Sequence, residues 1–252
     1  MIAAVATALL VFGRISALMA TLPVMNARGV PRRVTLVYSL AISLVAATSV
    51  PVIAEPTSLS VLLFGMAGEV ATGMVLGLSV QGIFAAFALA AELASGQMNL
   101  AMSMTPDPFL KNNETGIGAL ASWLAAVVFV STGLHLKAIE IVATSFHDIP
   151  PGTLGMPVGA VPAFVEVMSR GFMLGIQLAG PILAMAWLVN LFMALLSKIA
   201  PRMNAFFSMG GALTAPAGIF MFSASIPWML YVHREELEAA VGRLNLLLEA
   251  MR

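Results

Sequence analysis

The residues that could carry chemistry are few and scattered in this sequence. The sequence contains no His-Glu-x-x-His, Gly-x-Ser-x-Gly or Gly-x-x-x-x-Gly-Lys motif, so it has no signature of a zinc protease, a serine hydrolase or a phosphate-binding loop. It has no cysteine, which excludes disulfides, thiolate catalysis and Cys-ligated metal centres. His135, His147 and His233 all fall near the ends of apolar stretches, and we interpret them as interfacial polar residues rather than metal ligands. We predict no catalytic, cofactor or metal site and no enzymatic activity.

Among the charges in or beside the long apolar stretches, three are the next candidates for a functional role: Arg14, Glu69 and Glu92. Arg14 lies in the middle of the first one, where a charge costs about 2.5–3.5 kcal/mol on insertion scales unless it reaches the interface or finds a partner. Glu69 and Glu92 flank another apolar stretch with no ionisable residue between them. We interpret these two acids as markers of helix ends rather than as a proton relay.

The composition explains why charges are rare. Sixty percent of the residues are hydrophobic and 10% are charged, whereas soluble domains have about 45–50% and about 25%. The formal net charge is zero, which leaves no basic footprint for nucleic acid. The sequence therefore predicts a protein that uses the lipid bilayer as its solvent.

The distances between charges predict the helices, because a membrane span needs about 20 predominantly apolar residues. We predict an all-α integral membrane protein with about six hydrophobic helices, which form a single membrane-embedded domain over residues 1–252 and pack as hairpins within a larger helical assembly. The first is a retained helix, since the N-terminal stretch has no basic region and no small-residue cleavage site. The predicted helices are 1–27, 34–54, 70–91, 115–136, 171–197 and 203–233, followed by an amphipathic tail at 234–252. That tail lies on a membrane surface or a partner, or is a solvated helical end.

The basic residues predict the orientation. If the N-terminus lies outside, the short inside loops hold six of them and the short outside loops hold two, which follows the positive-inside rule. The inside set is Arg28, Arg32, Arg33, Lys111, Lys198 and Arg202, and the outside set is Lys137 and Arg170.

Prolines and glycines interrupt several predicted spans. Pro181 lies in the fifth span, and Pro216 and Pro227 lie in the sixth, where each frees a backbone carbonyl that neighbouring protein must satisfy. Gly73-x-x-x-Gly77 and Gly171-x-x-x-Gly175 each place two glycines on one helical face, which allows close helix packing. These features favour helices that face other protein rather than lipid on all sides.

Methionines gather in the polar segment between the third and fourth predicted helices. Soft, unbranched methionine side chains can seal a gap of varied shape, so this segment is a candidate plug or constriction, and the alternative is ordinary filling of an apolar core. The candidate plug residues are Met98, Met102, Met104, Pro106, Asp107, Pro108 and Phe109.

Four separated segments resemble the FliR family, the R-type export-gate subunits of flagellar and related type III secretion systems. The first holds Arg14-Ile15-Ser16-Ala17, Pro23 and Val30-Pro31-Arg32-Arg33, and the second holds Glu69, Gly73, Gly77, Gly96 and Asp107-Pro108. The third holds Gly133-Leu134-His135, Ser145-Phe146 and Pro150, and the fourth holds Gly180-Pro181, Asn190-Leu191 and Ala200-Pro201-Arg202-Met203-Asn204-Ala205-Phe206.

The resemblance implies a subunit that assembles with P-type and Q-type subunits and the B-type switch protein into a gate for unfolded export substrates. The gate belongs to the bacterial inner membrane, in the flagellar basal body, with the N-terminus of this chain periplasmic. By position, the plug of the closed pore falls on Met98–Phe109 and the inside turn of a Q-like hairpin on Lys198–Asn204. Candidate assembly residues are Arg14, Pro23, Pro31, Gly73, Gly77, Gly171, Gly175, Pro181, Pro201 and Asn204.

Two alternatives stay open from the sequence. One is an injectisome homologue within the same family. The other, from a different class, is a small-molecule secondary transporter. The breaks in the helices favour a transporter, but the lack of a detectable inverted repeat is evidence against one.

Overall fold

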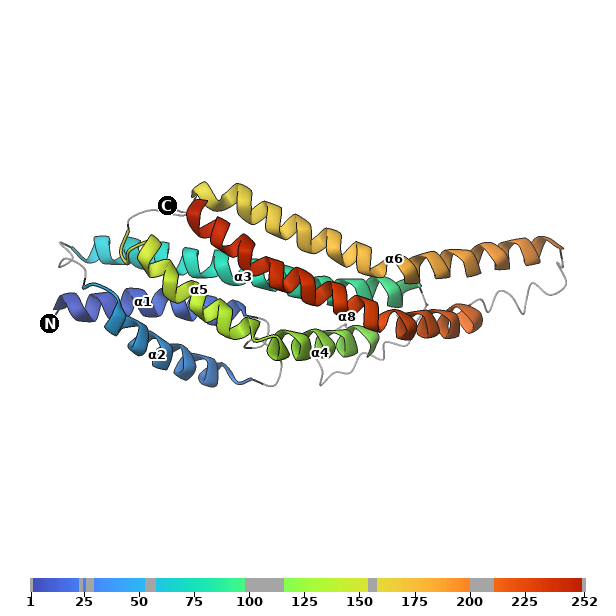
Figure 1. Ribbon diagram of the computed structural model, residues 1–252, viewed down its shortest axis with the longest axis horizontal. Helices are drawn as coiled ribbons and strands as arrows, with labels where there is room; N and C mark the ends of the chain where they lie inside the picture. The colour runs from blue at the N-terminus through green and yellow to red at the C-terminus, as the bar shows by residue number, and fades with distance from the viewer. Residues whose placement is uncertain are drawn as a thin grey trace. The chain divides into compact units, whose positions relative to one another are not determined.

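The protein is built from helices in every part that the structure describes. The structure is a computed structural model, and it describes residues 2–22, 25, 30–52, 58–97, 116–153, 158–199 and 211–250. Those residues form no strand, and the predicted all-α class is confirmed. The elements are α1 (Ile2–Thr21), α2 (Arg32–Ser49), α3 (Leu59–Gln97), α4 (Gly116–Ser131), α5 (Leu134–Asp148), the 3₁₀ turn η2 (Val158–Ala160), α6 (Val161–Ile199) and α8 (Gly211–Ala250) (Figure 1).

Three of the helices are longer than a bilayer requires. α3 and α6 have 39 residues each and α8 has 40, which at about 1.5 Å per residue is about 60 Å, twice the thickness of a hydrocarbon core. α3 extends beyond the predicted 70–91 at both ends. α8 continues without a break from the predicted sixth span into the predicted tail at 234–252.

Four helices are long and apolar enough to cross a membrane, or five if a bent pair counts as one span. The four are α1, α3, α6 and α8, and the bent pair is α4 with α5. α2, which corresponds to the predicted span 34–54, is not among them, since its first two residues are Arg32 and Arg33.

The predicted fourth span, 115–136, is divided in the structure. α4 ends at Ser131, α5 begins at Leu134, and the two helices differ in direction by 62°. Gly133 between them has φ 69°, a left-handed conformation that glycine adopts without a side-chain clash. The helix then continues to Asp148, beyond the predicted end, because Lys137 and Glu140 lie on exposed positions of α5 and do not interrupt it.

The helix interiors contain the predicted prolines. Pro181 lies inside α6, and Pro216 and Pro227 lie inside α8. Each removes one backbone hydrogen bond from its helix, yet both helices continue past their prolines.

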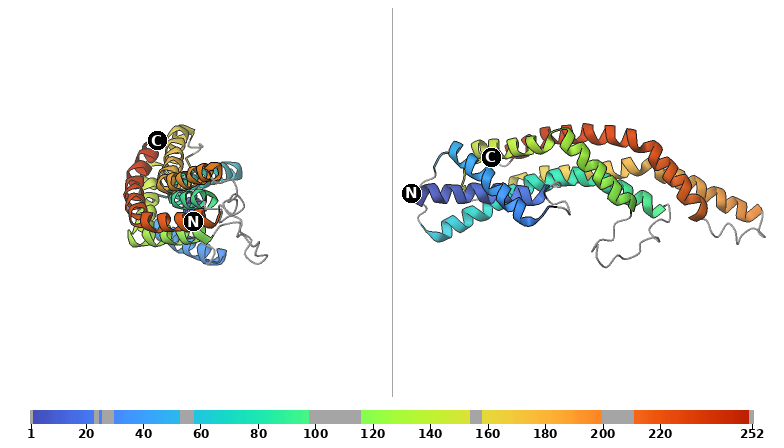
Figure 2. Two further views of the ribbon diagram at one scale, coloured as in Figure 1. Left: turned by 90° about the vertical axis from the view of Figure 1, so that its right-hand side faces the viewer. Right: turned by 90° about the horizontal axis from the view of Figure 1, so that it is seen from below.

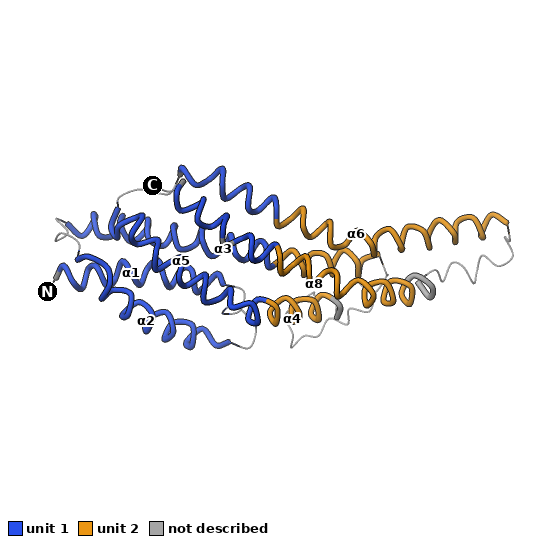
Figure 3. The backbone as a smooth tube through the Cα atoms, in the orientation of Figure 1, with its two compact units in different colours: residues 1–84, 129–170, 236–252 blue, residues 85–128, 171–235 orange. Residues whose placement is uncertain are grey.

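The described chain divides into two compact units (Figure 3). Unit 1 consists of residues 1–84, 129–170 and 236–252, and its buried side chains include Leu10, Val11 and Leu18 of α1 and Val142 and Phe146 of α5. Within this unit α1 packs against α2, the next helix in the sequence. Figures 1 and 2 show these two helices side by side.

Unit 2 consists of residues 85–128 and 171–235. Its core is rich in small side chains, because close approach of helix backbones needs little side-chain volume between them. The buried residues include Ala86, Ala90, Ala91 and Ala94 of α3, Ala121 and Ala125 of α4, and Leu178, Ala179 and Ile182 of α6.

Candidate functional site

Unit 1 contains a completely buried arginine. The side chain of Arg14, in the second half of α1, is 0% exposed, and its neighbours Val11, Ile15 and Leu18 are buried apolar residues. Taking a charge out of water is costly unless hydrogen bonds and an opposite charge replace the water. The surroundings of Arg14 supply both.

The opposite charge belongs to Glu69 of α3. Arg14 Nε donates to Glu69 Oε2 at 2.6 Å, and Arg14 Nη2 donates to Glu69 Oε1 at 3.1 Å. Two parallel bonds of this kind match the planar guanidinium to the planar carboxylate. Glu69 is 2% exposed, so the two formal charges cancel inside the protein.

The remaining donors of Arg14 reach α5 and the turn that follows it. Nη1 donates to Oγ of Ser145 at 2.9 Å, and Nη2 donates to the carbonyl oxygen of Ile149 at 3.0 Å. The Ser145 hydroxyl itself donates to the Val142 carbonyl at 2.7 Å, which leaves its oxygen lone pairs to accept from Arg14. The ring centroid of Phe146 lies 4.3 Å from Arg14 Cζ, a cation–π contact. One side chain thus links α1, α3 and α5.

The turn after α5 also binds the charge pair through its backbone. The Gly152 N–H donates to Glu69 Oε1 at 3.0 Å, and Gly152 has φ 81°, a conformation that favours glycine. A Cβ built on Gly65 of α3 would lie 3.4 Å from the Cα of Gly152, so the turn packs directly on α3. The Arg14–Glu69 pair therefore fixes the path of the chain from the end of α5 to Gly152.

Two glycines bring α3 close to α1 beside this pair. A Cβ at Gly73 would overlap the carbonyl oxygen of Arg14, and a Cβ at Gly77 would overlap Oγ1 of Thr21. Only a residue without a side chain allows this approach. The predicted Gly73-x-x-x-Gly77 face thus lies against α1, one and two helical turns beyond Glu69, and it sets the distance across which Arg14 reaches Glu69.

A second charged cluster in unit 1 joins α6 to α8. Glu236 accepts from Arg243 Nη2 at 2.9 Å, and Glu236 also forms an ion pair with Arg170. This cluster is partly exposed, with 42% of the Arg170 side chain accessible. Exposed pairs of this kind contribute about 0–1 kcal/mol, so this cluster is weaker than the Arg14 site.

The other predicted assembly residues that the structure describes lie apart from the Arg14 site. Pro31 precedes α2 in an extended conformation with φ −62° and ψ 137°. Pro181 is half-buried in α6, and Gly171 is buried. A Cβ on Gly175 would lie 2.7 Å from Cδ2 of Leu89 within unit 2, another close helix approach.

Several predicted residues lie outside the described part of the chain. These are the assembly candidates Pro23, Pro201 and Asn204 and the whole candidate plug, Met98, Met102, Met104, Pro106, Asp107, Pro108 and Phe109.

The interpretation of Glu69 as a helix-end marker was wrong. Glu69 lies ten residues after the first residue of α3, Leu59. A charge limits an apolar helix only when it needs water, and the carboxylate of Glu69 has Arg14 and Gly152 in place of water. The sequence did hold a signal for this pairing, since Arg14 in an apolar span requires a partner. Ser145 was notable only as part of the third family-like segment, and Gly152 gave no signal.

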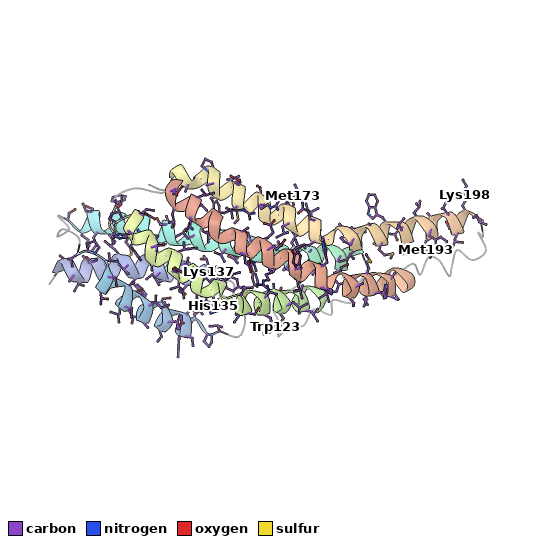
Figure 4. The ribbon with its side chains drawn as sticks, in the orientation of Figure 1. Trp123, His135, Lys137, Met173, Met193 and Lys198 are labelled. Carbon is purple, nitrogen blue, oxygen red and sulfur yellow. The ribbon has the colours of Figure 1, made fainter. Side chains whose placement is uncertain are left out.

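The prediction that the histidines lie near span ends also needs correction for His233. His233 lies inside α8 with 0% exposure, and its ring centroid lies 5.3 Å from that of Phe87 within unit 2. His135 is in the first turn of α5 (Figure 4), and its ring centroid lies 6.4 Å from that of Phe129. His147 is exposed in the last turn of the same helix. Within the described ranges no three His, Cys, Asp or Glu side chains gather closely enough to hold a metal ion.

Comparisons with known proteins show the family to which the chain belongs. The family described as bacterial export proteins, family 1, matches residues 5–240. The flagellar biosynthetic protein FliR of Escherichia coli K12 is 30% identical over 214 residues, which cover 85% of this chain and 82% of that protein. FliR of Pectobacterium carotovorum is 31% identical over 222 residues, covering 86% and 82%, and FliR of Caulobacter vibrioides is 28% identical over 222 residues, covering 87% and 88%. The chain therefore belongs to family 1 of the bacterial export proteins, the family predicted from its four sequence segments.

Proposed function

We propose that this flagellar export subunit is a non-enzymatic core component of the export gate and forms part of the channel for unfolded export substrates. The observation that carries the proposal is the family match over residues 5–240, which includes every described helix of the chain in whole or in part. The buried Arg14 site supports a structural rather than a catalytic role, since both of its charged side chains are enclosed and paired with each other.

The proposed partners are P-type and Q-type gate subunits and the B-type switch protein. The long helices leave large apolar side chains exposed, including Trp187 (72%), Leu188 and Leu191 on α6. Apolar surface of this extent needs lipid or other protein to cover it. Prolines inside the same helices favour protein, which can supply partners for the freed carbonyls.

The proposed location is the bacterial inner membrane, within the flagellar basal body and with the N-terminus periplasmic. Four or five candidate spans support a membrane-embedded chain. The excess of basic residues in the loops predicted to lie inside supports the orientation.

The function is tested by removing the chain from its own bacterium and measuring secretion of flagellar filament protein. We expect secretion and filaments to be lost and to return when the intact chain is supplied again. Filaments of normal length in cells that lack the chain would contradict the proposal. Purification in mild detergent gives a second measurement, in which we expect small hydrophobic subunits to accompany the chain.

The plug is tested by deleting Ser103–Phe109 and measuring ion leakage through membranes that contain the assembled gate. We expect leakage to rise, because the soft side chain of Met104 and the Pro-Asp-Pro segment would no longer seal the closed pore. Replacement of Asn112 and Asn113 by glycine is the matched control and should leave the membrane tight. Unchanged permeability after the deletion would eliminate the plug assignment without affecting the family assignment.

A further inference from the structure

An open groove of about 730 Å³ runs between α2 and α5 in unit 1. Its α2 wall reaches from Tyr38 to Ser49 and its α5 wall from Ile139 to His147. At about 1.5 Å per residue the longer wall is about 16 Å, or three helical turns. The floor is closed by α1, where the cavity behind the groove, lined by residues such as Ile15 and Leu18, measures only about 20 Å³.

The walls of the groove are apolar side chains that the chain itself leaves uncovered. Val45 of α2 is 71% exposed and Tyr38 is 46% exposed, and Ala41 and Ala143 on either side are small. Small residues and exposed branched side chains along three turns form the type of surface that receives the ridge of another helix, with contacts at positions i, i+4 and i+7.

One wall carries an acidic side chain that has no partner in the described part of the chain. Glu140 lies on an exposed position of α5. Lys137, one turn earlier and outside the groove lining, forms no ion pair with it in the structure. The hydroxyl of Thr144, one turn later, donates a hydrogen bond to the carbonyl oxygen of Ile141. Its oxygen can therefore only accept a hydrogen bond from an incoming group.

These observations indicate which kind of partner would fit the groove. A lipid tail could cover the apolar walls but would offer Glu140 neither a counter-charge nor a hydrogen-bond donor. A helix that carries a Lys or Arg among small and branched apolar residues satisfies both the walls and the carboxylate.

We propose that the α2–α5 groove receives an apolar helix of another gate subunit, and that a basic side chain of that helix pairs with Glu140. This inference rests on the proposed function, because it assigns the groove to a partner within the export gate. It extends that function by assigning the contact to one face of unit 1.

Crosslinking tests the occupant directly. A photo-activatable amino acid at Val45, which lines the groove, is compared with the same group at Leu44, which is 59% exposed but does not line it. In the assembled complex we expect Val45 to crosslink at least tenfold more than Leu44 to one P-type or Q-type subunit, at a peptide with a Lys or Arg within one helical turn. Crosslinks from Val45 to lipid alone, or none, would overturn the inference.

Charge reversal tests the pairing. We expect Glu140→Lys to reduce co-purification of the crosslinked subunit by at least tenfold, and an acidic substitution at the basic residue of that subunit to restore it. Lys137→Glu is the control with a neighbouring exposed charge, and it should leave co-purification unchanged. Folding of the Glu140→Lys chain is verified by an unchanged unfolding temperature in detergent.

The outcomes separate this inference from the proposed function. Co-purification of gate subunits that survives Glu140→Lys overturns the groove assignment and leaves the function intact. A chain of the natural sequence that co-purifies with no gate subunit contradicts the proposed function itself.

Discussion

At the scale of single residues, the Arg14–Glu69 pair determines geometry more than it adds stability. In a buried ion pair the favourable Coulomb energy between the charges is about equal to the free energy of hydration that they lose. Replacing both partners by apolar residues of similar volume is therefore often neutral or stabilising. The pair is nonetheless connected to three helices and a turn through Ser145, Ile149 and Gly152. It is therefore the point in unit 1 at which the relative register of α1, α3 and α5 is fixed.

This reasoning predicts an asymmetry between single and double substitutions. Glu69→Leu should lower the free energy of unfolding by about 3–5 kcal/mol, because it leaves Arg14 charged and buried without a partner. The double variant Arg14→Met, Glu69→Leu should recover most of that loss. The measurement is thermal unfolding of each detergent-solubilised variant, followed by loss of the monodisperse peak in size-exclusion chromatography. A double variant no more stable than Glu69→Leu would show that the pair itself stabilises the fold.

The sequence revealed one half of this site and not the other. Arg14 was conspicuous because a cation in the middle of an apolar stretch demands an explanation. Its partners lie 55, 131 and 135 residues away along the chain, and pairing over such separations depends on tertiary structure that no local pattern contains. The same pairing explains the misplaced helix end, since Glu69 resembles a charge at a water interface until Arg14 is placed beside it.

At the scale of elements, the α1–α3 contact depends on glycines at which any side chain would collide. We expect Gly73→Ala to lower the free energy of unfolding by about 1–3 kcal/mol, because the added Cβ would meet the backbone carbonyl of Arg14, which cannot rotate away. Gly96→Ala in the same helix is the control, since a Cβ there meets nothing within 4 Å. It should leave stability unchanged or raise it through better helix propensity. Equal effects of the two substitutions in thermal unfolding would rule out the close approach.

The break between α4 and α5 depends on a different property of glycine. Gly133 has φ 69°, and a Cβ added there would meet nothing within 4 Å, so a substitution there acts through the backbone and not through packing. Gly133→Ala should cost about 1–2 kcal/mol, and Gly133→Asn should cost less, because asparagine tolerates the left-handed region. Gly242→Ala, in open space within α8, should instead stabilise the chain. An equally stable Gly133→Ala variant in a denaturant or thermal series would show that the two helices can join without this conformation.

At the scale of the whole molecule, the composition predicted the class of structure correctly, and the distances between charges predicted where most helices lie. The charges could not predict the division of the fourth span, because Gly133 is uncharged and the segment on both sides of it is apolar. Nor could they predict that α8 continues to Ala250, since Glu236 forms ion pairs with Arg170 and Arg243 and so does not end the helix at the bilayer interface.

The exposed apolar face of α6 leads to the last prediction. Trp187, Leu188, Leu191, Phe192 and Leu195 are all more than half exposed, within a helix that qualifies as a membrane span. If another gate subunit covers this face, a carboxylate at Leu188 would be buried against apolar surface without a counter-charge. We expect Leu188→Glu to lower the amount of chain recovered in the complex by about a hundredfold or more, because an uncompensated buried charge costs about 3–5 kcal/mol and each 1.4 kcal/mol is about a factor of ten.

Two measurements on the same cells distinguish what covers that face. The membrane-integrated fraction after carbonate extraction reports contact with lipid, and co-purification with tagged P-type or Q-type subunits reports contact with protein. Because α6 contains Pro181, whose freed carbonyl is better satisfied by protein than by lipid, we expect co-purification to fall while the membrane fraction changes little. Ser169→Glu, an exposed position of α6 just before the predicted span, controls for the added charge and should change neither quantity. A Leu188→Glu chain that leaves the membrane yet keeps its partners would place this face in lipid.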